Sequence, residues 1–194
     1  MGDKRDPERT RAALLDAALV EFSAKGRAGA RTSDIAARAG VNKQLITHHF
    51  GGKDGLYRAL VDRWLAREAE YGGSGVPLAD VAAAYVEDGV RERDLHRLLL
   101  RASLEDEEDG GGLSTDDLAD MRERQRAGEV SGELDPAFVL LALQAVAAAG
   151  IVFPGDVRRL TGMDPASPAF ATWHARQLRC MTGLLAEPPP DTDR

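Results

Sequence analysis

Apolar side chains recur every three or four positions along most of this chain, and no stretch alternates apolar and polar residues over any length. Asp6-Pro7 is typical of a helix start, because aspartate caps free backbone amides and proline at the first helical position loses no hydrogen bond. Gly26 is expected to end that helix. One face of it carries the apolar residues Leu15, Ala18, Leu19 and Phe22. The helical period throughout predicts an all-α fold.

Two short helices are predicted next. The first runs from about Ser33 to Ala39, with Thr32 as its cap, and ends at Gly40. Asn42 is a good N-cap for a second helix that continues to about His49. Two short helices joined by a three- or four-residue turn containing glycine are typical of a helix-turn-helix.

Longer helices follow, separated by glycine- and proline-rich breaks. The expected helices are 53–71, 78–91, 94–105, 115–127, 136–153 and 168–185. The G-G-S-G stretch at 72–75 is the best internal boundary. The predicted organisation is a helix-turn-helix domain over 1–52, a connecting helix over 53–71, a helical domain over 76–187 and a disordered tail over 188–194.

The longest apolar run, Ala137 to Phe153, is shorter than the roughly 20 residues that span a bilayer, and it contains Gln144. We therefore expect a buried helix and no membrane partner. Cys180 is the single cysteine, so no internal disulfide can form, and no charged-then-apolar leader opens the chain. These features favour the cytoplasm.

Charge is unevenly distributed along the chain. The formal net charge is −7, yet residues 1–64 hold 12 Lys and Arg against 8 Asp and Glu, while the remainder holds 13 against 24. A basic N-terminal part on an acidic body suggests a nucleic-acid partner for the basic part, although the asymmetry could also arise by chance.

The stretch N-K-Q-L-I-T-H-H-F, residues 42–50, carries the candidate chemistry. On a helix, Ile46 and Phe50 lie one turn apart and face the core, while polar side chains face outward. All of these outward side chains can contact phosphates or base edges of DNA. They are Lys43, Gln44, Thr47 and His48, with Leu45 at the flank as a possible contact to a thymine methyl.

This stretch has three other interpretations. Adjacent His48 and His49 point about 100° apart on a helix, which disfavours chelation of one metal ion. No carboxylate lies three or four residues away to orient either imidazole for acid-base catalysis. The polar side chains could also form a solvated helix face without a partner.

The longer stretch T-S-D-I-A-A-R-A-G-V-N-K-Q-L-I-T-H-H-F-G-G-K-D-G-L-Y, Thr32 to Tyr57, closely resembles the DNA-binding signature of the tetracycline-repressor (TetR) family of bacterial regulators. The resemblance covers roughly residues 8–64. It implies a homodimer that reads an inverted repeat in double-stranded DNA, and a variable C-terminal body that binds a small molecule and releases the DNA.

The resemblance also implies roles for individual residues. Thr32 and Lys53 would contact backbone phosphates at helix starts, where free amides also favour phosphate. The recognition helix would carry Lys43, Gln44, Leu45, Thr47 and His48, and Asn42 at its cap is also a predicted DNA-binding residue. Thr47 stands where the family usually has a tyrosine, and Gln44 replaces a common glycine, so the operator sequence is not implied.

The body has no motif, so its interpretation rests on pattern. Helices 136–153 and 168–185 resemble the two-helix dimerisation face of the family, although either could simply fill the core of one chain. The second carries apolar residues at Phe170, Trp173, Leu178, Met181 and Leu185. Candidate ligand-lining residues are Tyr85, His96, Phe138, Trp173 and His174.

The acidic stretch at 105–112 spaces acids and a glycine as in a calcium loop, but Glu105 replaces the first aspartate and Asp116 the final glutamate, so a solvated loop is expected. An enzyme is the rival interpretation, with Cys180 or His174 as possible reactive groups. None of the common catalytic, phosphate-binding or dinucleotide motifs occurs, and no cofactor is expected. A regulator without a ligand is a third possibility.

Overall fold

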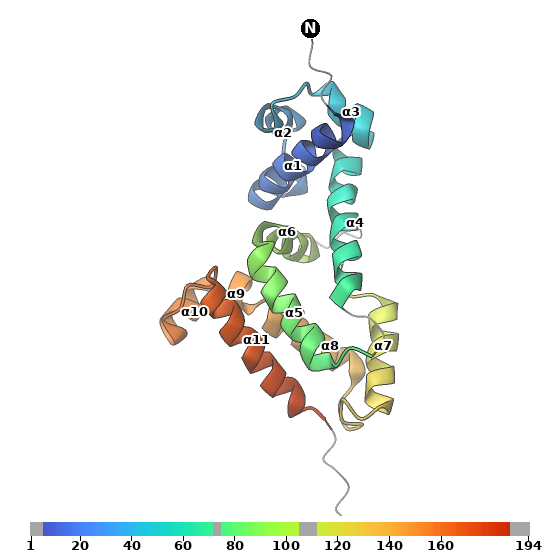
Figure 1. Cartoon of the computed structure of the whole chain (residues 1–194), viewed down its shortest axis with the longest axis vertical. Coiled ribbons are helices and arrows are strands. Elements are labelled where there is room, and N and C mark those ends of the chain that lie inside the picture. The colour runs from blue at the N-terminus through green and yellow to red at the C-terminus, as the bar shows by residue number, and fades with distance from the viewer. Residues whose placement is uncertain (1–5, 72–74, 105–111, 187–194) are drawn as a thin grey trace, which may run out of the picture. The chain divides into compact units, whose positions relative to one another are not determined.

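The computed structural model describes residues 6–71, 75–104 and 112–186, and every regular element within these ranges is a helix (Figure 1). The predicted all-α fold is confirmed. Three predicted features fall on residues outside the described ranges. They are the break at 72–75 apart from Gly75, the acidic stretch at 105–112 apart from Gly112, and the tail at 188–194.

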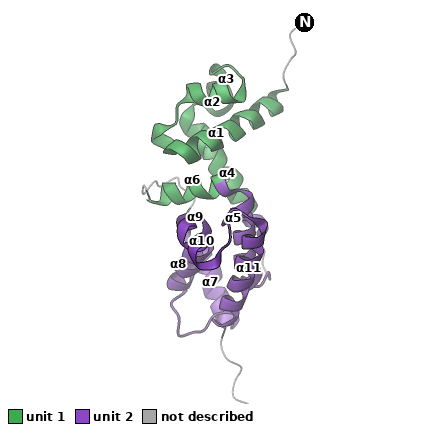
Figure 2. Cartoon of the chain, turned by 90° about the vertical axis from the view of Figure 1, so that its left-hand side faces the viewer, with its two compact units in different colours: residues 1–67, 94–112 green, residues 68–93, 113–194 purple. Residues whose placement is uncertain are grey.

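The chain divides into two compact units, coloured separately in Figure 2. The first comprises Met1–Arg67 and Asp94–Gly112, and the second comprises Glu68–Arg93 and Leu113–Arg194. The chain therefore leaves the first unit, builds two helical segments of the second, and returns to the first before completing the second. The boundary predicted at 72–75 does not include a return of the chain to the first unit through α6.

The first unit contains α1 (Pro7–Gly29), α2 (Thr32–Ala39), α3 (Gln44–Phe50), most of α4 (Lys53–Tyr71) and nearly all of α6 (Arg93–Leu104). The Asp6 carboxylate accepts from the Glu8 amide at 3.0 Å, as the capping pattern predicted. Gly26 interrupts the helical geometry at φ 71 and ψ 169, after which α1 continues to Gly29. The predicted end at Gly26 is thus a kink followed by one more turn.

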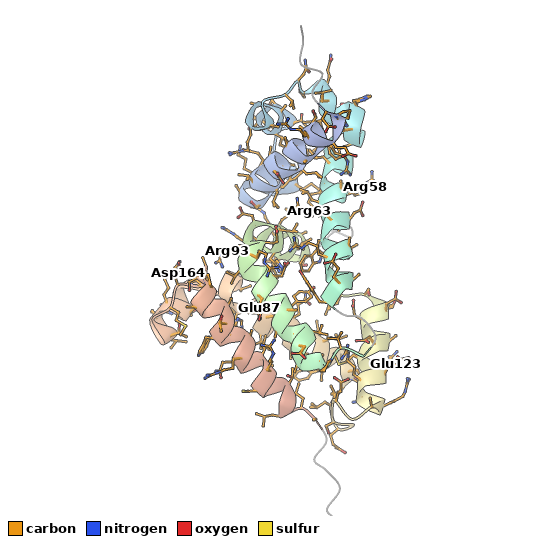
Figure 3. The ribbon with its side chains drawn as sticks, viewed as in Figure 1. Arg58, Arg63, Glu87, Arg93, Glu123 and Asp164 are labelled. Atoms are coloured by element: carbon orange, nitrogen blue, oxygen red, sulfur yellow. The ribbon has the colours of Figure 1, made fainter. Side chains whose placement is uncertain are left out.

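Each helix of this unit contributes large apolar side chains to its core. Trp64 and Tyr57 of α4 are almost completely buried, and the Tyr57 ring meets Phe22 of α1 edge-on at 5.5 Å. Arg63 of α4, labelled in Figure 3, donates to the Asp16 carboxylate of α1 at 3.3 Å. The buried face of α1 and the apolar spacing of α4 agree with the predicted pattern.

The second unit is built from α5 (Leu78–Arg91), α7 (Thr115–Arg126), α8 (Pro136–Ala147), α9 (Ala149–Val152), α10 (Pro154–Thr161) and α11 (Pro168–Gly183). Helix α11 packs along α5, while α8 packs against α5, α7 and α11. The shared core includes Ala83, Val86, Met121, Val139, Ala175 and Leu178. Arg93, labelled in Figure 3, ties this unit together by donating to the Gly150 and Pro165 carbonyls at 3.0 and 3.1 Å.

The single helix predicted over 136–153 is wrong in its second half. Regular α8 ends at Ala147, and α9 follows as a short separate helix. Gly150 in α9 lies so close to Phe170 that an added Cβ would be 2.6 Å from the ring. Pro154, expected to end a helix, occupies the first position of α10, which was not predicted.

The prediction that α8 is a buried helix is also wrong on one side. Val139 and Leu143 are buried in the core of the second unit. Phe138 and Leu141, one turn apart, leave 62% and 61% of their surface exposed. Helix α8 therefore presents an apolar stripe that the described residues of this chain do not cover.

Among the described residues, no helix combines the length and the apolar character that crossing a bilayer requires.

Candidate nucleic-acid interface

The turn between α2 and α3 is shaped by one glycine and one asparagine. Gly40 has the left-handed conformation (φ 64, ψ 34), which glycine adopts at little cost, and its amide and that of Val41 donate to the Ala37 and Ala36 carbonyls at 3.1 and 3.0 Å. Asn42 Oδ1 then accepts from the Gln44 amide at 2.8 Å. The predicted stop at Gly40 is confirmed. The cap position before α3 is Lys43, one residue after the predicted Asn42, although Asn42 still accepts from the first amide of the helix.

Helix α3 has one buried side and one polar exposed side. Ile46 is 1% exposed, which anchors the helix in the core of the first unit. Four candidate contact residues are exposed on the other side: Lys43, Gln44, Thr47 and His48. Leu45 is only half-buried at the flank, so it offers less surface than an exposed contact residue would. The geometry brings the polar residues of the predicted recognition face together.

The two histidines of α3 do not form a chelating pair in this geometry. The His48 and His49 rings meet edge-on, with centroids 5.1 Å apart and planes at 75°. Within residues 6–71, 75–104 and 112–186, no group of three or more His, Cys, Asp or Glu side chains is placed to hold a metal ion.

Thr32 does not cap α2, which corrects the predicted cap. It is the first residue of the helix, and the cap position before it is Arg31, whose side chain makes no capping bond. The Arg31 carbonyl instead accepts from the Asp34 and Ile35 amides at 3.0 and 3.1 Å. Thr32 is half-buried and remains beside the amino end of α2, where backbone amides favour an anion.

Lys53 at the start of α4 is engaged within the chain. Its Nζ donates to the carbonyls of Ala28 and Ala30 at 3.2 and 3.1 Å. The family resemblance implies a DNA phosphate as the partner of this ammonium. The carbonyls that receive it lie far away in sequence, and no local pattern points to them.

An ionic cluster fixes α2 against α1. The buried Glu21 carboxylate pairs with Lys25 Nζ at 2.6 Å and with Arg38 Nη2 at 3.0 Å, and Lys25 also reaches Asp34 at 3.1 Å. The hydrogen bond from Lys25, supported by Arg38, holds the pKa of Glu21 below its usual range. The same lysine lowers the pKa of Asp34, and its carboxylate partners raise the pKa of Lys25.

Sequence reasoning missed Arg11 as part of this region. Its guanidinium carbon lies 5.2 Å from the centroid of the Phe50 ring, so a cation of α1 stacks on the last residue of α3. Phe50 was predicted to face the core, but it is only half-buried. The sequence does not indicate this contact, because Arg11 and Phe50 are 39 positions apart.

The five candidate ligand residues do not lie in one unit. His96 is in the first unit, where its ring meets Trp64 edge-on at 4.4 Å. Phe138 in the second is 62% exposed, which does not suit the wall of a cavity within one chain. Tyr85, Trp173 and His174 remain as candidates in the second unit.

These three candidates have partly buried environments. Tyr85 donates to a Glu68 carboxylate oxygen, and burial raises the pKa of its phenol. His174 is buried, with its ring 5.1 Å from that of Phe170 and 6.2 Å from that of Trp173. Burial lowers the pKa of His174, although a hydrogen bond to the backbone of Val146 opposes the shift.

The apolar residues predicted for the last helix fill the core of their own unit. Phe170 and Leu178 are buried, and Trp173, Met181 and Leu185 are half-buried. Phe170 and Leu178 therefore pack within one chain, while the predicted role of α11 in a dimer stays a prediction. The exposed side of α11 carries Thr172, Arg176 and Cys180.

Part of the first unit is similar to known bacterial regulators. Residues 14–60 match the family described as "Bacterial regulatory proteins, tetR family". The HTH-type transcriptional repressor SCO4008 of Streptomyces coelicolor is 46% identical over 59 residues, which cover 30% of this chain and 31% of that protein. The HTH-type transcriptional regulator BetI of Paraburkholderia phytofirmans is 41% identical over 61 residues, covering 29% and 31%. The matches therefore span about a third of the length of these relatives.

Solved structures share the fold over most of the chain. The transcriptional regulator SCO4942 from Streptomyces coelicolor has a TM-score of 0.70 at 24% identity and covers 89% of this chain and 97% of its own. A gamma-butyrolactone receptor described as an ArpA-like protein has a TM-score of 0.62 at 23% identity and covers 91% and 100%. The helix-turn-helix of this chain therefore matches the tetR family of bacterial regulatory proteins over residues 14–60, and the fold is shared with these solved structures over most of the chain.

Proposed function

We propose that this protein is a dimeric, sequence-specific DNA-binding regulator that represses transcription from an inverted-repeat operator. The main support is the exposed polar face of α3, which is anchored in the core by buried Ile46. The side chains on this face are Lys43, Gln44, Thr47 and His48. A helix that presents such side chains fits the major groove, where lysine can bind guanine and glutamine can bind adenine. A relative over this region is a transcriptional repressor.

Contacts to the DNA backbone come from the ends of helices. Thr32 lies at the amino end of α2, beside backbone amides that attract phosphate, and Asn42 starts the turn into α3. Leu45 contributes at the flank of the face. The ammonium of Lys53 donates to the carbonyls of Ala28 and Ala30 instead.

The second unit is proposed to hold the dimer contact and the effector site. The apolar stripe of α8, with Phe138 and Leu141 exposed, needs a partner surface, and a twofold-related copy supplies an identical stripe. Release by a small molecule is suggested by the fold shared with a gamma-butyrolactone receptor. Tyr85, Trp173 and His174 are the residues proposed to contact such a molecule. The proposed location of the protein is the cytoplasm, where the DNA lies.

The mechanism is a population shift between two arrangements of the dimer. In one arrangement the two DNA-binding units have the spacing that the operator requires, and in the other they do not. An effector that binds the second arrangement more tightly than the first lowers the affinity for DNA, and the ratio of its two affinities limits the size of the effect. A coupling of about 1–3 kcal/mol would weaken operator binding about 5- to 150-fold.

The test is a titration of the purified protein, by fluorescence anisotropy at several salt concentrations, onto labelled duplexes from its own upstream region and an unrelated duplex. We expect tight selective binding with two or more chains per site. Equal weak binding to both duplexes would contradict an operator in that region, and absence of binding at low salt would favour the enzyme alternative. The complex can then be used to find molecules that release it.

A further inference from the structure

Lys53 joins the start of α4 to the end of α1. Its ammonium spans the carbonyls of Ala28 and Ala30, at 3.2 and 3.1 Å. These carbonyls lie in and just after the short turn that follows the kink at Gly26. An ammonium has three N–H donors, so two of them are committed to this contact.

The neighbouring residues strengthen the same junction. The Asp54 carboxylate accepts from Arg27 Nε and Nη2 at 3.3 and 3.2 Å. The guanidinium carbon of Arg27 also lies 5.0 Å from the centroid of the buried Tyr57 ring. The first turn of α4 is therefore held to α1 by an ammonium bridge, an ion pair and an aromatic contact.

This first turn also supports the C-terminal end of α3. A Cβ added at Gly55 would lie 1.7 Å from the Phe50 carbonyl oxygen, so the two backbones are in direct contact. Gly51 ends α3 in the left-handed conformation at φ 74, and its amide donates to the Thr47 carbonyl at 2.9 Å. The orientation of α3 relative to α1 thus depends on where the first turn of α4 lies.

We propose that Lys53 is a positioning residue: its ammonium latches α1 to the first turn of α4, and that turn orients the recognition helix α3. This inference rests on the proposed DNA-binding function and assigns Lys53 a role other than a phosphate contact. A lost phosphate contact reduces the salt dependence of binding, whereas a lost latch lowers affinity and leaves that dependence unchanged.

The experiment compares three variants with the wild type. Lys53→Met removes the ammonium, Lys53→Arg keeps a cation with N–H donors, and Lys43→Met is the matched control at an exposed lysine of the proposed DNA face. The DNA is a duplex selected by the wild type from a random-sequence library, and affinity is measured over a series of salt concentrations. Amide hydrogen exchange is measured separately, without DNA.

For Lys53→Met we expect about tenfold weaker binding with the wild-type salt slope, as befits the loss of charged hydrogen bonds. Amides in the last turn of α1 and the first turn of α4 should exchange faster, and Lys53→Arg should restore both properties. Lys43→Met should weaken binding through a lost base contact and leave exchange in those turns unchanged.

Two results would overturn the inference. One is a slope for Lys53→Met that falls by about 0.9 per chain, which is the mark of a phosphate contact. The other is wild-type exchange in both turns, whatever the affinity. If the wild type enriches no sequence from the library, the proposed function fails, and the exchange comparison still decides whether the latch exists.

Discussion

Lys43 and Gln44 stand at the start of α3 with exposed side chains, where a base-reading residue would be placed. Replacing both with alanine should change or abolish operator choice, because each lost base contact costs about 1–3 kcal/mol of discrimination. Selection from a random duplex library measures the preference, and sedimentation measures the dimer. The control is Arg122→Ala at an exposed site of α7. A double variant with the wild-type sequence preference would contradict this assignment.

His174 supports a prediction about stability and pH. Burial lowers the pKa of His174 below the ordinary 6.5, so the unfolded chain binds a proton at this site more readily than the folded chain. Stability is therefore complete above about pH 6.5 and decreases as the pH falls toward the folded pKa, by at most about 1.4 kcal/mol per pH unit. The pKa values of Glu21 and Asp34 are lowered, which places their effect at more acidic pH.

The measurement is urea unfolding of the wild type and His174→Gln between about pH 5 and pH 8, since the histidine titrates there and most carboxylates do not. We expect a shallower dependence for the variant. If the two curves run parallel over this range, protonation of His174 does not contribute to the loss of stability.

At the scale of elements, Gly55 tests how closely α4 approaches α3. Alanine at this position would bring a Cβ within 1.7 Å of the Phe50 carbonyl oxygen, a backbone atom that cannot move alone. We expect Gly55→Ala to cost about 3 kcal/mol of unfolding free energy and to impair DNA binding, as overpacking does. Gly155→Ala in α10 is the matched control, because nothing lies within 4 Å of its added Cβ. Equal stability of both variants in chemical denaturation would refute the close contact.

Elements with strong local signals could be predicted from the sequence, and those decided by distant contacts could not. Gly40 and Asn42 act through backbone geometry within a few residues, so the helix-turn-helix was predicted with its turn. Proline is common both just after the end of a helix and at the first position of a helix. Pro154 therefore did not indicate that α10 begins there. The kink at Gly26 is a similar case, because the glycine ends one helical segment and a further turn follows it.

The same distinction applies to the candidate site. The outward face of α3 follows from helical periodicity once Ile46 is placed inside. The partners of Lys53 lie 23 and 25 residues earlier in the chain, so its hydrogen bonds to Ala30 and Ala28 required the folded structure. Apolar composition marked α8 as an important helix, but which of its residues face inward depends on how α5, α7 and α11 surround it.

At the scale of the whole molecule, the proposed dimer depends on the stripe that α8 leaves exposed. Phe138 and Leu141 lie one turn apart with 62% and 61% exposure, and a twofold-related copy would bury both. Replacing both with glutamate would place four carboxylates in the proposed interface of a dimer, where burial of unpaired charge is costly. We expect the double variant to be monomeric in sedimentation velocity while it keeps its helical content.

Dissociation should also weaken operator binding, because two linked DNA-binding units gain a large effective concentration at an inverted repeat. The matched control is Leu104→Glu on α6, a leucine that is 87% exposed and lies outside the α8 stripe. The control should leave both dimer and operator binding unchanged. A dimeric Phe138→Glu/Leu141→Glu variant would place the contact between copies elsewhere, whereas a monomeric variant with wild-type operator affinity would show that DNA binding does not need the dimer.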